Sequence, residues 1–134
     1  MSAAPALTEI DYRDASGFRL PSPVEVGRRL LYLGALFDEA EKALRERDEA
    51  WVQAKQRYEV AYARAFLGSE QTSDMKRKQD AVRATADLKL DMEIAAQIVR
   101  GIESRIKTLD RQMEIARSVG ATSRAEMQAN GWTP

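Results

Sequence analysis

The sequence contains no cysteine and no histidine, and these two absences exclude whole classes of chemistry. The chain cannot form a disulfide, a Cys₄ or Cys₂His₂ zinc site, a thiol nucleophile or a histidine general base. Glycine-rich phosphate loops and the serine-hydrolase motif are also missing. Acidic pairs such as Asp38 with Glu41 remain, but neighbouring carboxylates on a helix are usually exposed surface. The sequence therefore predicts a protein that is not an enzyme, with no catalytic residue, no cofactor and no metal.

An excess of either charge is missing as well, because 21 Lys and Arg residues balance 21 Asp and Glu residues. A general attraction to nucleic acid or to anionic membranes is not expected from such a balance. No apolar run approaches the roughly 20 residues that span a bilayer, and the first residues, MSAAPALTEIDYRD, lack the basic and apolar regions of a signal peptide. These features predict a cytoplasmic protein that does not enter the membrane.

Helix breakers are scarce, with 7 glycines and 4 prolines in 134 residues, and their positions divide the chain. Residues 1–21 include Pro5, Gly17 and Pro21 and are expected to form an irregular arm. Ser22 is a suitable N-cap before Pro23, and Glu25 completes a capping box. The helical hairpin predicted over 22–120 consists of one helix over about 23–67, a linker at 68–73 and a second helix over about 74–118.

Glycine at position 120 is expected to stop the second helix. In the remaining segment, 121–134, Ser123 and Glu126 form another capping box, which predicts a short helix over 124–129 followed by a tail. Trp132 lies in that tail and could dock on the hairpin or anchor a protein partner.

Apolar residues recur at intervals of three and four in both predicted helices, which is typical of a coiled-coil seam. In the first helix the large residues fall every seven positions and small ones fill the companion row, interrupted by Arg47. The seam residues are Leu30, Phe37, Leu44, Trp51, Tyr58 and Ala65 with Leu33, Ala40, Ala54 and Ala61, and in the second helix Met92, Val99, Ile106 and Met113 with Leu88, Ala95, Ile102, Leu109 and Ala116. The predicted fold class is all-α, a long antiparallel coiled-coil helical hairpin.

Additional apolar residues lie off this seam in the second helix, at Leu90, Ile94 and Ile98, where Gly101 permits a close helix approach. Two helices alone bury little apolar surface, so these positions need cover. The arm could supply part of it. A second subunit is the favoured source, which predicts a homo-oligomer, a dimer or higher, assembled as a helical bundle through this face.

The end of the hairpin near the linker carries an excess of basic residues, which we call the basic tip: Arg57, Arg64, Lys76, Arg77, Lys78 and Arg83. Cations in the first turn of a helix oppose the helix dipole, which can indicate a phosphate-binding or nucleic-acid-binding site; a solvated helix start is the alternative. The aromatic series Tyr58, Tyr62 and Phe66 is expected to pack against the second helix, with stacking of bases on Tyr62 as the alternative. Arg47 is expected to extend outwards, or else to pair with an acid on the facing helix.

Three segments carry a resemblance to a known group of proteins: YEVAYARAFL (58–67), KRKQDAVRATADLKLDMEIA (76–95) and RQMEIARSVGATSRAEM (111–127). They resemble small, largely uncharacterised coiled-coil helical proteins of actinobacterial bacteriophages, similar to those of mycobacteriophages, over roughly residues 45–127. The resemblance implies a phage or prophage source, and hence the cytoplasm of the host. It also implies an accessory protein that binds a host, defence, recombination or replication partner.

Together these patterns predict a non-enzymatic, phage-type accessory protein that acts through protein–protein interaction. One alternative is an accessory protein that binds nucleic acid through the basic tip. Another is an oligomeric sponge for nucleotides or related small molecules, whose arginines hold phosphates between subunits. A structural role in the virion also remains open.

Overall fold

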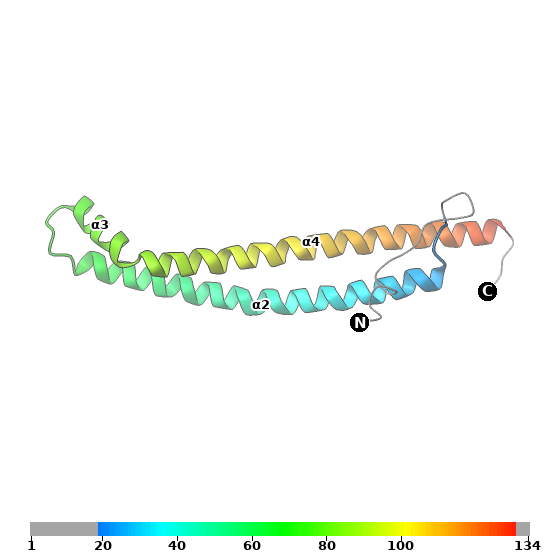
Figure 1. The fold of residues 1–134 in the computed structure, drawn as a ribbon, viewed down its shortest axis with the longest axis horizontal. Coiled ribbons are helices and arrows are strands. Elements are labelled where there is room, and N and C mark those ends of the chain that lie inside the picture. The colour runs from blue at the N-terminus through cyan, green and yellow to red at the C-terminus, as the bar shows by residue number, and fades with distance from the viewer. Residues whose placement is uncertain (1–18, 131–134) are drawn as a thin grey trace. The chain divides into compact units, whose positions relative to one another are not determined.

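The computed structural model describes residues 19–130, which form three α-helices (Figure 1). They are α2 (Pro23–Leu67), α3 (Asp74–Ala84) and α4 (Ala86–Ala129). No strand occurs within residues 19–130, so the predicted all-α class is confirmed. Most of the expected arm, and the tail that contains Trp132, lie outside the described residues.

Helix α2 begins where a local hydrogen bond satisfies one of its free amides. The backbone N–H of Glu25 donates to the Ser22 hydroxyl oxygen at 3.2 Å, as expected of an N-cap. The Glu25 carboxylate does not close a capping box but forms an ion pair with Arg19 at 3.4 Å. The bounds of α2 coincide with the range expected from its start and stop residues.

The linker between α2 and α3 is held by side chains from both of its ends. The Ser69 hydroxyl donates to the Asp80 carboxylate at 2.7 Å, and the Arg77 guanidinium donates to the Gln71 carbonyl at 2.8 Å. The Ser73 hydroxyl accepts the backbone N–H of Lys76 and caps α3. The linker is therefore tied to α3 by polar contacts.

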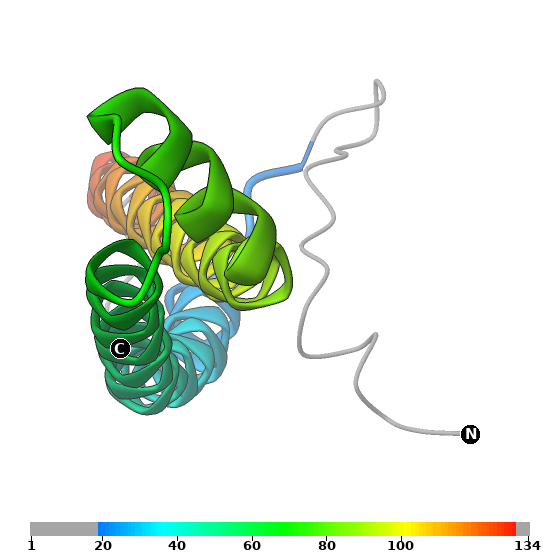
Figure 2. The same cartoon turned by 90° about the vertical axis from the view of Figure 1, so that its left-hand side faces the viewer.

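The expected single helix over 74–118 is wrong, because the structure breaks it at Thr85. This residue has φ −113° and ψ 12°, outside the helical region, and divides α3 from α4. Its hydroxyl donates to the Ala81 carbonyl at 2.6 Å while only 2% of the residue is exposed. Such a bond to the preceding turn bends helices, and α3 leaves the line of α4 at this junction in Figures 1 and 2.

The chain divides into two compact units, and the boundary between them falls within α2 and again within α4. The terminal unit comprises the described residues 19–41 and 105–130, and the loop unit comprises Lys42–Ser104. In the terminal unit, Leu33 and Ala40 of α2 are buried with Leu109 and Met113 of α4. Four partly buried side chains pack around this cluster: Leu30, Leu36, Phe37 and Ile106. This cluster is the core of the terminal unit.

The expected helix stop at Gly120 and the separate helix over 124–129 are also wrong, since α4 continues without interruption to Ala129. A Cβ atom at Gly120 would lie 2.9 Å from Cγ1 of Val26, so the glycine permits close packing against α2. The Ser123 hydroxyl does not cap a helix but donates to the Pro21 carbonyl at 2.6 Å. Both residues are buried. Gly120 and Ser123, which were expected to mark helix boundaries, thus both make tertiary contacts.

The loop unit has a much thinner interior than the terminal unit. Its buried apolar residues are Ala54, Ala81 and Val99, of which only valine is larger than alanine. The larger seam residues of this unit remain half-buried: Leu44, Trp51, Tyr58, Leu88, Met92 and Ile102. The small companion row on α2 thus lies deeper than the large row, since Ala54 is buried and Trp51 is not.

Candidate interaction surfaces

The apolar residues that were expected to form an oligomer face lie together on one side of α4. Leu90, Ile94 and Ile98 follow each other at intervals of four, so helical geometry aligns them, and they are 56%, 51% and 40% exposed. A Cβ atom at Gly101 would meet no atom within 4 Å. We call these four residues the α4 face. Its exposure agrees with the prediction, whereas its role as an interface stays a prediction.

The loop unit as a whole exposes more large apolar side chains than it buries. Eight of its large hydrophobic residues are exposed: Val52, Val60, Leu67, Met75, Val82, Leu90, Ile94 and Ile98. In the terminal unit only Val24, Leu31 and Ile115 are exposed in this way, against six buried apolar residues. Scattered exposed hydrophobic residues need no explanation, but aligned ones indicate a contact surface.

The six residues of the basic tip differ in their exposure and in their contacts. Lys76, Lys78 and Arg83 are exposed on α3, but Arg77 is partly buried. Its guanidinium lies 6.0 Å from the centre of the Phe66 ring and donates to the Gln71 carbonyl. Arg77 therefore holds the linker, and the cations of α3 that face solvent are the other three.

The remaining two basic residues, Arg57 and Arg64, lie exposed on α2 beside a shallow, open depression of the loop unit. Val60 and Ala61 of α2 and Leu88 of α4 supply its apolar lining, and Gln56 and Glu59 complete it. The depression is thus lined by two cations, Arg57 and Arg64, beside apolar side chains, but the acidic residue Glu59 lines it as well. It is a shallow surface feature and not an enclosed cavity.

The aromatic series on α2 is half-buried at all three positions. The rings of Tyr58 and Tyr62 are 6.0 Å apart at an angle of 49°, and Phe66 contacts Arg77 of α3. Arg77 lies in the range expected of the second helix, so the contact of Phe66 agrees with the packing expected of this series at that one position. Base stacking on Tyr62 stays an untested alternative.

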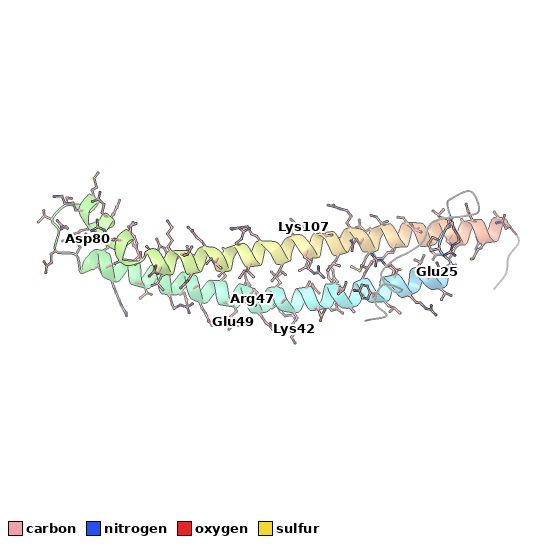
Figure 3. The ribbon with its side chains drawn as sticks, in the orientation of Figure 1. Glu25, Lys42, Arg47, Glu49, Asp80 and Lys107 are labelled. Carbon is pink, nitrogen blue, oxygen red and sulfur yellow. The ribbon has the colours of Figure 1, made fainter. Side chains whose placement is uncertain are left out.

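Among the single residues considered from the sequence, Arg47 is exposed and has no ion-pair partner within residues 19–130 (Figure 3). The outward orientation expected of it is therefore the one observed. Asp80, in contrast, was not identified from the sequence, although it accepts the Ser69 hydroxyl at the linker. Nothing in the spacing of these two residues indicates the contact, since they lie eleven positions apart.

Within residues 19–130, no three Asp and Glu side chains converge into a group able to hold a metal ion. In the same part of the chain, none of the helices has a segment sufficiently long and apolar to cross a membrane. Comparisons with protein-family models, with curated proteins and with solved structures found no match to the chain. The resemblance to phage proteins stays a prediction.

Proposed function

We propose that the protein is a non-enzymatic accessory protein that acts through protein–protein contact, as a homo-oligomer assembled by the loop unit. The observation that carries this proposal is the contrast between the two units. The terminal unit buries four apolar residues larger than alanine and leaves three exposed, whereas the loop unit leaves eight exposed and buries only one apolar residue larger than alanine, Val99. A protein–protein contact at the loop unit would remove this surface from water.

The architecture proposed for the subunit is an antiparallel coiled-coil hairpin. Contacts in the terminal unit support it, because Val26 near the start of α2 lies against Gly120 near the end of α4. Further along α2, Leu33 clusters with Leu109 and Met113. The order of contacts along α4 is thus the reverse of that along α2. The proposed hairpin continues the same pairing through the loop unit.

The proposed partners, besides a second copy, are a host, defence, recombination or replication protein of a phage-infected cell. The resemblance to actinobacteriophage proteins supports this choice of partner, and the lack of cysteine and histidine supports the non-enzymatic part of the proposal. In this proposal the α4 face is used for assembly and the exposed end of the loop unit remains available for the partner.

The test of assembly is the solution mass of the full chain and of an Ile94→Glu/Ile98→Glu variant, measured by sedimentation over a concentration series. Burying the exposed half of each isoleucine contributes about 1 kcal/mol, and a dimer contains four of them. We therefore expect the variant to weaken assembly roughly a thousandfold. Ile115→Glu is the matched control, since Ile115 lies on the same helix and is 54% exposed, but belongs to the terminal unit. A monomeric wild-type chain, or an unchanged mass in the double variant, would refute the proposed assembly.

A second candidate function, nucleic-acid binding, is favoured by the exposure of Lys76, Lys78 and Arg83 on the short helix α3. Binding of labelled single- or double-stranded DNA would then fall steeply with salt, and Lys76→Glu/Lys78→Glu would abolish it. A Lys42→Glu/Lys107→Glu variant makes the same change in net charge at two exposed sites outside α3, one on α2 and one on α4 (Figure 3). Equal loss in both variants would show that only net charge matters, and no binding by the wild type at low salt would exclude this function.

A further inference from the structure

The residues of the α4 face are complementary to a second copy of the same face that runs in the opposite direction. Read from the N-terminal end, the face consists of Leu90, Ile94, Ile98 and Gly101. If a second α4 runs in the opposite direction and the two cross at the level of Ala96, Ile94 of each copy lies beside Ile98 of the other. Leu90 then lies within one residue of the level of the other copy's Gly101, where a Cβ atom would meet nothing within 4 Å. A large residue thus faces a glycine at both ends of the contact.

The charged residues along the edge of this face fit the same arrangement. Glu93, Gln97 and Arg100 form one row beside the α4 face, because their spacing of three and four keeps them on one side of a helix. Glu93 and Arg100 are seven residues, or about 10 Å, apart along their own helix. They are too distant for an ion pair within one chain, and the structure shows none for either among the described residues.

In the antiparallel arrangement, Glu93 of one copy reaches the level of Arg100 of the other, and the two pairs are equivalent by symmetry. The Arg100 guanidinium already lies on this edge, donating to the Gln97 side-chain oxygen at 2.7 Å. A parallel arrangement in the same register would instead bring Glu93 beside Glu93 and Arg100 beside Arg100. Like charges disfavour that alternative.

We propose that the occupant of the α4 face is a second copy of this chain, bound antiparallel across a twofold axis at the level of Ala96, with Glu93 of each copy paired to Arg100 of the other. This inference rests on the proposed assembly through the loop unit and specifies its partner and register. The apolar residues supply the contact area. The charges select the direction, since complementary charge determines specificity more than affinity.

The first test uses the absence of cysteine in the chain, which permits clean single-cysteine variants. In the proposed register, residue 97 of one copy lies about 3 Å along the axis from residue 97 of the other, whereas two copies of residue 104 lie about 24 Å apart. We expect Gln97→Cys to form a disulfide-linked dimer under mild oxidation and Ser104→Cys to remain uncrosslinked. Ser104 is the matched control because it lies on the same edge two turns further along α4 and is also exposed.

The second test exchanges the charges. Glu93→Arg alone and Arg100→Glu alone each replace two attractive pairs by two repulsive ones, and we expect either to weaken dimerisation roughly tenfold. The Glu93→Arg/Arg100→Glu variant restores opposite charges and is expected to recover wild-type dimerisation. Both side chains are exposed, so the helix content of the subunit should not change.

The outcomes separate the register from the proposed function. Crosslinking at residue 97 alone, together with recovery in the double charge variant, supports the antiparallel dimer. Equal crosslinking at residues 97 and 104, or no recovery on charge exchange, overturns the register while the assembly of the loop unit stands. A wild-type chain that is monomeric at all concentrations overturns both.

Discussion

Gly120 provides the most direct test of how the terminal unit is packed. Replacing it with alanine would put a Cβ atom 2.9 Å from Cγ1 of Val26, a contact too close for carbon atoms. Val26 is 3% exposed and its β-branched side chain is restricted at χ1, so moving its methyl group away is costly. Overpacking of this kind costs about 1–3 kcal/mol. Alanine also favours a helix over glycine by about 1 kcal/mol, which leaves a net destabilisation of about 0–2 kcal/mol.

Gly34→Ala is the matched control for this prediction. Gly34 lies within α2 in the same unit, and a Cβ atom there would meet nothing within 4 Å. Its replacement should therefore stabilise the protein by about 1 kcal/mol. Because both variants make the same chemical change in a helix, the difference between them isolates the clash with Val26 at about 1–3 kcal/mol.

The assay is thermal or urea unfolding followed by circular dichroism, at one protein concentration so that assembly contributes equally. The expected difference corresponds to a gap of about 4–12 °C between the two midpoints. A Val26→Ala/Gly120→Ala variant should be less destabilised than the sum of its single changes, since the new methyl group occupies the space left by valine. If both glycine variants stabilise the protein to the same extent, Gly120 is not a packing residue and the reasoning is wrong.

Three further predictions concern buried groups. Leu33→Ala, at a residue 1% exposed, should cost about 2–5 kcal/mol, whereas Leu31→Ala, at 78% exposure, should change the unfolding free energy by less than about 0.5 kcal/mol; equal effects would contradict the core. Ser123→Ala should cost about 1–3 kcal/mol because the Pro21 carbonyl loses its donor. Thr85→Ala should cost less than about 1 kcal/mol, since the backbone N–H at that position also donates to the carbonyl one turn earlier and remains in place. If Thr85→Ala lowered the unfolding free energy more than Ser123→Ala, loss of the hydrogen-bond donor would not explain the cost of these substitutions.

The candidate surfaces were only partly predictable. Helical spacing alone aligns Leu90, Ile94 and Ile98, and the α4 face follows from that spacing. How far each side chain stays exposed depends on which sides of α4 are covered by other helices, so the exposure needed the structure. Arg77 shows the opposite case: its sequence position suggested a free cation, but its contacts with Phe66 and Gln71 use it in the linker.

The sequence by itself determined the helical class, the course of α2 and the starts of α2 and α3. Those features depend on residues close together in the chain, such as Ser22 with Glu25 and Ser73 with Lys76, and on an apolar period that extends over many turns. Local hydrogen bonds and helical spacing do not require knowledge of distant contacts. They can therefore be predicted from neighbouring residues.

Only the tertiary structure decided that α4 continues through Gly120 and Ser123. A glycine costs a helix about 1 kcal/mol, which is a weak stop signal. Close packing of Gly120 on Val26 and the hydrogen bond from Ser123 to Pro21 can offset such a cost, and α4 continues through both positions. At Thr85 the buried hydroxyl bonds to the preceding turn and the helix bends. Glycine and serine can end a helix or pack it against another segment, and at Gly120 and Ser123 their distant neighbours determine which occurs.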